Sequence, residues 1–409
     1  MVIDVEKNKN TPKIRFKGFT DAWEQRKVTE VGKLSIGLVT TMTSHYTDKG
    51  TLLIRNSDIK NNKFVFDSNP IYLDEEFATK NEKRKHQIGD VITVHTGDVG
   101  TSAVITEKTK NSLGFATLIT RPNSKIIDSN FLSIFYNTDK HKKWAILRST
   151  GDGRTNYNLG DFIQLNVPIT NLNEQRKISQ FIGNIDNLIT LHQNKYHKLL
   201  KVKKSMLEKM FPQDSENFPK WRFKGFTDAW EQRKFEDYGN VSMCKRIFKD
   251  ETSDVGDVPF YKIGTFGGNA DAFITYEKYN NYKLNFSFPK EGDILLSASG
   301  TIGRIIEYTG EKAYFQDSNI VWLNHNNEIK NSFLKVLYPI VKWDGIEGST
   351  IKRLYNSNFL NTSFMIPNTK EQEQIGNLFN KIDNLITLYQ SKCNKLIEIK
   401  KSLLEKMFI

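Results

Sequence analysis

The sequence predicts an α+β protein with two mixed α/β domains separated by two long antiparallel coiled-coil helices, related by an internal pseudo-twofold symmetry. The first observation behind this prediction is a box, PKIRFKGFTDAWEQRK at 12–27, that recurs at 219–234 with one substitution. The second is a helical segment, IDNLITL at 185–191, that recurs at 382–388. The third is that the sequence diverges between these repeats. Constant segments around divergent inserts indicate one scaffold that holds two different binding domains.

The repeated helical segments belong to a sustained heptad pattern of apolar residues. This seam runs from Ile178 to Met210 and, in the same register, from Ile375 to Met407. We therefore expect one long helix over 173–209 and a matching helix near the end of the chain, both in a coiled coil. If the two seams pair with each other, the helices run antiparallel and the divergent domains sit at their opposite ends. Each helix then ends near the box that precedes the other helix's domain.

Two lysines, Lys203 and Lys400, interrupt the apolar seam at matched positions. They either set the register of the helix pair or lie near an exposed end of the seam, and the sequence leaves both explanations open. We assign 1–170 to the first domain with its box, 171–211 to the first helix, 212–367 to the second domain with its box, and 368–409 to the second helix.

The divergent domains carry strand-like and helix-like stretches. Runs rich in β-branched residues, such as DVITVHT and FATLITR in the first domain and DILLSAS and NIVWLN in the second, predict strands. The stretches 131–148 and 331–343 look helical. The domains share a GD…GxxG stretch, at 89–100 and 292–303, whose last two glycines we expect to form tight turns rather than a dinucleotide fingerprint.

Composition favours a polyanionic partner without locating it. The 409 residues include 59 Lys and Arg against 47 Asp and Glu, a formal net charge of +12. Half of this excess lies on the helices, because 174–210 has eight basic and three acidic residues and 371–408 has six and five. A solvated helix face explains such charge as well as a ligand does. Charge alone therefore does not place a binding site.

The two cysteines, Cys244 and Cys393, have no metal-ligand or disulfide spacing, which suits a reducing compartment. The chain shows neither a signal peptide nor an apolar run near the ~18 residues of a membrane span, so we expect a cytoplasmic protein. We find no phosphate loop, no HExxH, no paired CxxC, no GxSxG elbow and no Asn/Asp-Pro-Pro-Tyr sequence. These absences favour binding over catalysis.

DNA recognition needs cations for phosphates and forked donors for base edges. Two corresponding loops, STGDGRTNYN at 149–158 and EGSTIKRLYN at 347–356, contain such side chains beside glycines and hydroxyls. The first-loop candidates are Arg148, Ser149, Thr150, Arg154, Asn156 and Tyr157. The second-loop candidates are Ser349, Thr350, Lys352, Arg353 and Tyr355. Further candidates are Arg55, Asn56, His95, Lys245, Arg246 and Lys262. An exposed polar hairpin without a ligand explains either loop about equally well.

Taken together, these features resemble the specificity subunits of type I restriction-modification enzymes. The resemblance rests on the RFKGFTDAWEQRK boxes, the GD…GxxG stretches, a proline followed by Glu-Gln, and the IDNLITL helices. It covers nearly the whole chain in the family's order. One departure is that two more residues separate Pro168 from Glu174 than separate Pro367 from Glu371, for which we expect a different loop entry.

The resemblance implies a detailed function. Each divergent domain would be a target-recognition domain that reads one half of an asymmetric, bipartite DNA site. The helices would set the gap and dock two methyltransferase subunits that transfer methyl from S-adenosylmethionine to adenine N6. Motor-nuclease subunits with ATP and Mg would complete the restriction form. The chain itself would hold no cofactor, no metal and no catalytic residue.

Two other classes of protein remain compatible with the residues. One is a coiled-coil adaptor that displays two domains for ligands other than nucleic acids. The other is a self-sufficient enzyme with an unrecognised active site. Salt-dependent DNA binding separates the first from a specificity subunit, and turnover by the isolated chain would reveal the second.

Overall fold

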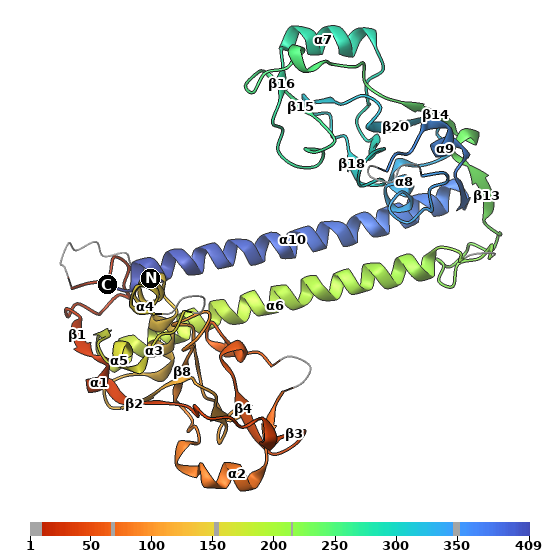
Figure 1. The fold of residues 1–409 in the computed structure, drawn as a ribbon. Coiled ribbons are helices and arrows are strands. Elements are labelled where there is room, and N and C mark those ends of the chain that lie inside the picture. Colours follow the sequence, from red (N-terminus) through yellow and green to blue (C-terminus); the bar gives the residue numbers. More distant parts are fainter. Residues whose placement is uncertain (1–9, 67–69, 151–154, 214–215, 347–351) are drawn as a thin grey trace. The chain divides into compact units, whose positions relative to one another are not determined.

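The computed structural model describes residues 10–66, 70–150, 155–213, 216–346 and 352–409. The chain divides into two compact units: the first comprises 1–192 and 392–409, and the second comprises 193–391. Two long helices, α6 (Leu172–Met210) and α10 (Thr369–Met407), contribute residues to both units (Figure 1). The predicted helices are therefore present. The first ends shortly before Pro212, whose ring and missing N–H do not fit a helix interior.

The first unit is built on short, mostly antiparallel sheets. Its central sheet has the order β2-β11-β8-β9, comprising β2 (Gly32–Ile36), β11 (Leu118–Pro122), β8 (Val91–Thr93) and β9 (Ser102–Val104). A second sheet has the order β10-β4-β7-β3, comprising β10 (Leu113–Gly114), β4 (Thr51–Ile54), β7 (Tyr72–Leu73) and β3 (Tyr46–Thr47). Strand β1 (Glu24–Lys27) of the box pairs with β12 (Asn166–Ile169), and β5 (Ile59–Lys60) pairs with β6 (Lys63–Phe64).

The helices of the first unit are α1 (Val28–Val31), α2 (Glu75–Lys80), α3 (Ser129–Tyr136), α4 (Asp139–Arg148) and α5 (Leu159–Phe162). The stretch expected to be helical over 131–148 is thus two helices. Thr138 separates them, because its hydroxyl accepts the His141 N–H and caps the start of α4. The buried core joins α3, the box and the helix ends, with Trp23, Ile182 and Met407 among its members.

The second unit repeats this plan. Its central sheet has the order β14-β20-β17-β18, comprising β14 (Gly239–Ser242), β20 (Ile320–His325), β17 (Ile294–Ser297) and β18 (Ile305–Glu307). A smaller sheet has the order β16-β15-β19, comprising β16 (Phe273–Ile274), β15 (Val258–Tyr261) and β19 (Tyr314–Phe315). The box strand β13 (Glu231–Lys234) pairs with β21 (Ser363–Ile366). The helices are α7 (Tyr276–Asn285), α8 (Asn331–Leu337) and α9 (Asn356–Asn361). Two divergent sequences therefore form one topology, and the predicted α+β class with two repeated domains is confirmed.

Each box fastens a long helix to its domain. In the first unit, Arg15 of the box forms a bidentate ion pair with Glu174 of α6, and both side chains are nearly inaccessible to solvent. In the second unit, Arg222 makes the same pair with Glu371 of α10. Buried charges are tolerated when they are paired and hydrogen-bonded in this way. The identity of the two boxes thus has a structural cause.

Each box also receives the end of the other long helix, as expected. The Ile14 N–H donates to the Lys406 carbonyl near the end of α10 in the first unit. The Trp221 N–H donates to the Lys209 carbonyl near the end of α6 in the second unit.

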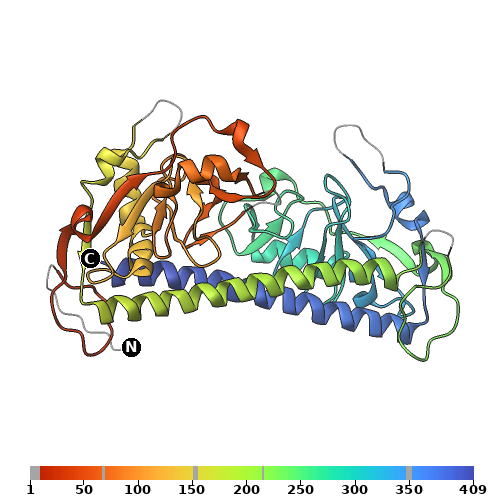
Figure 2. The ribbon, with the colours of Figure 1, turned by 90° about the horizontal axis from the view of Figure 1, so that it is seen from below.

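Within each unit, α6 and α10 lie side by side and run antiparallel (Figure 1, Figure 2). The two seam lysines are paired with acidic residues and do not lie at an exposed end of the seam. Lys400 binds Asp186 in the first unit, and Lys203 binds Asp383 in the second. Both aspartates belong to the IDNLITL repeat, so each repeat supplies the partner for the lysine of the opposite helix.

The structure corrects the expected loop difference before the helices. Glu24 faces Ile169 in the first unit, and its repeat Glu231 faces Ile366 in the second, which makes Thr170 the equivalent of Pro367. Gln175 and Gln372 confirm this register, since their amides donate to the carbonyls of Thr170 and Pro367. The two prolines are not equivalent, and no residues are inserted between the end of the strand and the helix.

Candidate nucleic-acid interface

Left-handed glycine turns follow a central strand in each domain. Gly97 and Gly100 have φ of 103° and 82°, and Gly300 and Gly303 have φ of 69° and 86°. Residues with a Cβ rarely adopt this backbone conformation. The expected tight turns are therefore confirmed. Each turn brings the end of the strand against the second half of the divergent loop that precedes the long helix.

In the first unit, the turn pairs with the segment 155–157. The Tyr157 N–H donates to the His95 carbonyl at 2.8 Å. Thr96 and Asn156 face each other in an antiparallel bridge, and Asn156 forms a second bridge with Thr150. Three candidate residues, Thr150, Asn156 and His95, are thus brought together by backbone pairing.

Side chains extend this contact into a polar cluster. The Asn56 Oδ1 accepts the His95 N–H at 2.8 Å, and the Asn56 Nδ2 donates to the Ala116 carbonyl at 3.1 Å. The Thr96 hydroxyl donates to the Asn156 Oδ1 at 2.8 Å. Partial burial lowers the pKa of His95 below its usual value.

Tyr157 does not lie on this surface, which corrects its place among the candidate contacts. Its side chain is 0% exposed. Its ring packs against Phe162 and Trp144, and its hydroxyl lies 3.5 Å from the His141 Nε2. Because successive side chains of an extended segment point to opposite faces, a buried Tyr157 leaves Asn156 facing outward. Arg154 lies outside the described residues.

The remaining candidates of the first unit flank the cluster. Arg148, at the end of α4, is exposed, with its guanidinium carbon 5.4 Å from the centroid of the Trp144 ring. It lines a cavity of about 450 Å³ together with Lys27. Ser149 is partly exposed, and its hydroxyl donates to the Ala145 carbonyl. Arg55 is held by Asp58 through two hydrogen bonds, so its fork of donors is already engaged.

The second unit pairs its turn with 352–354 in the same way. The Leu354 N–H donates to the Ala298 carbonyl at 2.8 Å, and the Gly300 N–H donates to the Lys352 carbonyl at 2.9 Å. Ser299 and Arg353 face each other in an antiparallel bridge. Tyr355, 46% exposed, follows this segment. Ser349 and Thr350 lie outside the described residues.

A polar chain also extends from this bridge. The Ser299 hydroxyl donates to the Asn319 Oδ1 at 2.7 Å, and Asp317, two residues earlier, accepts the Arg246 Nε at 2.7 Å. Three candidates are engaged elsewhere: Arg246 with Asp317, Lys262 with Asp271, and Lys245 over the ring of Phe286. The structure thus places Lys352 and Arg353 at the turn of the second unit and pairs Arg246 with Asp317.

The strand pairing at the glycine turns aligns the two loops with a shift of one residue relative to the direct alignment of their sequences. Tyr157 corresponds to Leu354, and both are buried, at 0% and 3%. Asn156 therefore corresponds to Arg353. Sequence reasoning did not single out Thr96 and Ser299, which hold these two residues. Their signal was their position in the GD…GxxG stretch, one residue before the first glycine of GxxG.

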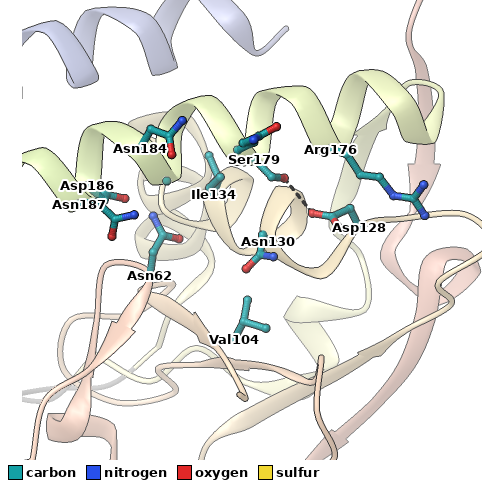
Figure 3. Close-up of a pocket in the computed structure, with 12 residues that line it drawn as sticks. Asn62, Val104, Asp128, Asn130, Ile134, Arg176, Ser179, Asn184, Asp186 and Asn187 are labelled. Carbon is teal, nitrogen blue, oxygen red and sulfur yellow. Dashed lines mark hydrogen bonds between the residues drawn. The ribbon is translucent and has the colours of Figure 1, made fainter. Parts of the chain in front are cut away.

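A second cavity of the first unit lies where α6 meets the domain (Figure 3). It has a volume of about 470 Å³ and a polar lining that includes Asn130, Arg176 and Asp186. The Ser179 hydroxyl donates to Asp128, which also caps α3. None of the described candidates for DNA contact lines it, so we regard it as part of the joint between helix and domain.

Among the residues described, no three His, Cys, Asp or Glu side chains gather as a metal site. None of the described helices has the length and apolar character that crossing a membrane requires.

The repeated sheets, the equivalent loops with different polar side chains, and the matched helices define a duplicated binding protein with two non-identical binding domains. Residues 20–201 and 227–399 both match the model of one family, the type I restriction modification DNA specificity domain. The chain belongs to this family, and DNA binding follows from the membership.

Individual relatives agree with this assignment. A candidate type I restriction enzyme specificity subunit of Haemophilus influenzae is 51% identical over 150 residues, which are 36% of this chain and 39% of that protein. The chain thus matches well under half the length of that relative. A type I restriction enzyme specificity subunit of Methanocaldococcus jannaschii is 22% identical over 303 residues, 69% of each protein. The crystal structure of a type I restriction-modification S subunit from M. genitalium matches 98% of this chain and 99% of its own, with a TM-score of 0.65 and 16% identity. That match supports the fold.

Proposed function

We propose that this chain is a type I restriction-modification specificity subunit in which each domain reads one half of an asymmetric bipartite DNA site. The observation that carries the proposal is the equivalence of Asn156 and Arg353. Both lie at the same bridge in the same sheet topology, yet one is an amide and the other a guanidinium. Side chains of these types pair with different bases in the major groove. Two domains with the same topology but different side chains at the equivalent position would recognise dissimilar half-sites.

We further propose that the long helices dock two methyltransferase subunits. Four apolar residues of α6 are exposed, and so are their four equivalents on α10. The pairs are Leu188 and Leu385, Leu191 and Leu388, Leu200 and Ile397, and Val202 and Ile399, each between 38% and 47% exposed. Each unit carries one set of four, two from each helix. Exposed apolar clusters favour protein partners, and two matched sets suit two copies of one partner.

Catalysis then belongs to the partners. The methyltransferase subunits would bind S-adenosylmethionine and methylate adenine N6, and motor-nuclease subunits would use ATP and Mg. This chain would supply specificity and assembly. His141 and Tyr136, two described side chains with strongly altered pKa values, lie in the buried core rather than at a surface where a substrate could reach them.

The experiment is to express the chain with its methyltransferase and sequence the methylated adenines of the host DNA. We expect one motif with two dissimilar halves and an unspecific gap. Exchanging residues 28–170 for the corresponding domain of a relative should change one half and leave the other unchanged. A palindromic motif, or a change in both halves, would contradict two independent readers.

A salt titration separates this function from that of an adaptor for other ligands. DNA affinity of the assembled complex should fall steeply as salt rises, because each phosphate contact releases counterions. Binding that is absent or insensitive to salt, even with the methyltransferase present, would favour the adaptor.

A further inference from the structure

We propose that Arg353 reads a guanine in the half-site of the second domain, through bidentate hydrogen bonds to its N7 and O6 atoms in the major groove. This inference rests on the proposed function and goes beyond it, because it assigns one base to one side chain. The geometry that points to it is a rigid backbone that presents an unengaged guanidinium beside a polar surface.

The backbone of Arg353 is held on both sides. Its neighbours Lys352 and Leu354 bond to Gly300 and Ala298, and Arg353 itself faces Ser299 in the bridge. Leu354 is only 3% exposed and anchors the segment in the core of the second unit. Since successive side chains of an extended segment alternate between faces, the buried Leu354 directs Arg353 outward. Because its backbone is already held in place, Arg353 loses little backbone entropy when it binds DNA.

The side chain of Arg353 also differs from those of other cations in the second unit. Arg246 is engaged by Asp317, and Lys262 by Asp271. The guanidinium of Arg304 donates to the Ile263 carbonyl and lies over the ring of Phe266. In the part of the chain that the structure describes, the Arg353 side chain has neither a hydrogen bond nor an ion pair. Its five donors are therefore available, and a planar fork matches the N7 and O6 acceptors of guanine.

The first domain has a different side chain at the equivalent position. Asn156, the equivalent of Arg353, accepts the Thr96 hydroxyl with its Oδ1 atom. A bidentate contact to adenine would need that oxygen as an acceptor. An amide oxygen has two lone pairs, so Asn156 keeps one acceptor site and its amide donors for a base, but it lacks the charged fork that suits guanine. The guanine contact is therefore a property of the second half-site.

The test begins with the motif methylated by the wild-type chain and its methyltransferase. The second half-site must contain a specified guanine on either strand. Arg353→Gln removes the forked cation and should relax that position, lowering discrimination against other bases by about 5- to 150-fold. The first half-site, read from the same molecules, reports that the variant folds and assembles. An unchanged motif in this variant overturns the inference and leaves the proposed function standing, whereas an unmethylated wild-type host overturns the proposed function.

Lys352→Gln is the matched control, because it removes a positive charge one residue away. A phosphate-contacting lysine affects all sequences alike, so the motif should stay the same while the slope of log affinity against log salt falls by about one. A relaxed guanine position in this control, equal to that in Arg353→Gln, would show that charge rather than forked hydrogen bonding is read.

A measurement on the wild-type complex keeps the inference testable if Arg353→Gln fails to assemble. Synthetic sites carry 7-deazaguanine in place of each guanine of the second half-site in turn. Loss of the N7 acceptor at the guanine read by Arg353 should weaken binding by about fivefold or more. Inosine at the same position keeps N7 and O6 and should bind like guanine. The inference is wrong if no 7-deazaguanine substitution weakens binding more than inosine does.

Discussion

The Nζ atom of Lys400 lies 2.5 Å from the Oδ1 atom of Asp186, so a lysine of α10 is paired with an aspartate of α6 within the first unit. Lys203 and Asp383 repeat the pair in the second unit at 2.6 Å. Both lysines occupy positions where the heptad pattern calls for an apolar residue. A polar residue at one seam position specifies register in coiled coils, and here the register depends on a partner in the opposite helix.

Removing one of these pairs should cost a modest amount of stability. The aspartates are about one third exposed, so we expect Asp186→Asn and Lys400→Met each to lower the free energy of unfolding by about 1 kcal/mol. A double-mutant cycle from urea unfolding measures the coupling between them. Asp383→Asn tests the matched pair in the second unit. A coupling near zero would mean that the pair contributes nothing to the stability of the register.

The buried pair between Arg15 and Glu174 should behave differently. Glu174→Gln keeps the shape of the side chain but leaves the guanidinium of Arg15 buried without a counterion, which should cost about 3 kcal/mol or more. The exposed pair between Glu24 and Arg26 is the control, and Glu24→Gln should cost less than about 0.5 kcal/mol. Urea unfolding of both variants gives the comparison. Similar small losses in the two variants would show that the box is not fastened by this pair.

Stability should fall below neutral pH because of buried histidines. Burial lowers the pKa of His141 and of His86 from the ordinary 6.5 to about 4. Between pH 6.5 and 4 these histidines are protonated in the unfolded chain but stay neutral in the folded chain. The free energy of unfolding is therefore highest above pH 6.5 and falls as the pH drops toward 4. Each histidine contributes at most about 3 kcal/mol to this loss.

Urea unfolding at a series of pH values measures the effect. His141→Gln should flatten the dependence between pH 6.5 and 4.5, even if the variant is less stable at every pH. An unchanged slope would indicate that His141 titrates in the folded protein near its ordinary pKa.

The two glycines of the first turn should differ in their tolerance of alanine. At Gly97 an added Cβ meets nothing within 4 Å, so only the positive φ is penalised, by about 1 kcal/mol. At Gly100 the Cβ would lie 3.2 Å from the Ala145 Cβ and from the His141 ring, which adds a packing penalty to the same φ strain. Gly100→Ala should therefore unfold at lower urea than Gly97→Ala, and the reverse order would contradict the packing of the turn against α4.

The matched apolar residues predict how many methyltransferases bind. Leu188→Glu alters the set in the first unit, and Leu385→Glu alters the set in the second. We expect each single variant to retain one methyltransferase per chain and the double variant to retain none, as counted by native mass spectrometry. Leu284→Glu, at a residue of α7 that is 83% exposed, is the control and should retain both. Full occupancy in the double variant would place the docking surface elsewhere.

Part of the candidate interface could be foreseen from residue types, and part could not. Residue type identified Asn56, His95 and Arg353 as candidates, and the structure places them at or beside the glycine turns. Residue type did not distinguish Arg353 from Arg246, because the pairing of Arg246 with Asp317 joins residues far apart in the chain. The burial of Tyr157 was equally hidden, since a tyrosine beside an asparagine fits a surface loop or a core strand.

The sequence by itself determined the duplication, the extent of the two long helices and the register of their seams. These are local or periodic properties. Where the two halves of the sequence are nearly identical, direct alignment shows which residues correspond. Where the two halves of the sequence diverge, only the tertiary structure shows which residues are equivalent. Strand pairing makes Asn156 the equivalent of Arg353 and Thr170 the equivalent of Pro367, because hydrogen bonds between distant segments set that register. The same long-range contacts decided that the seam lysines are paired rather than exposed.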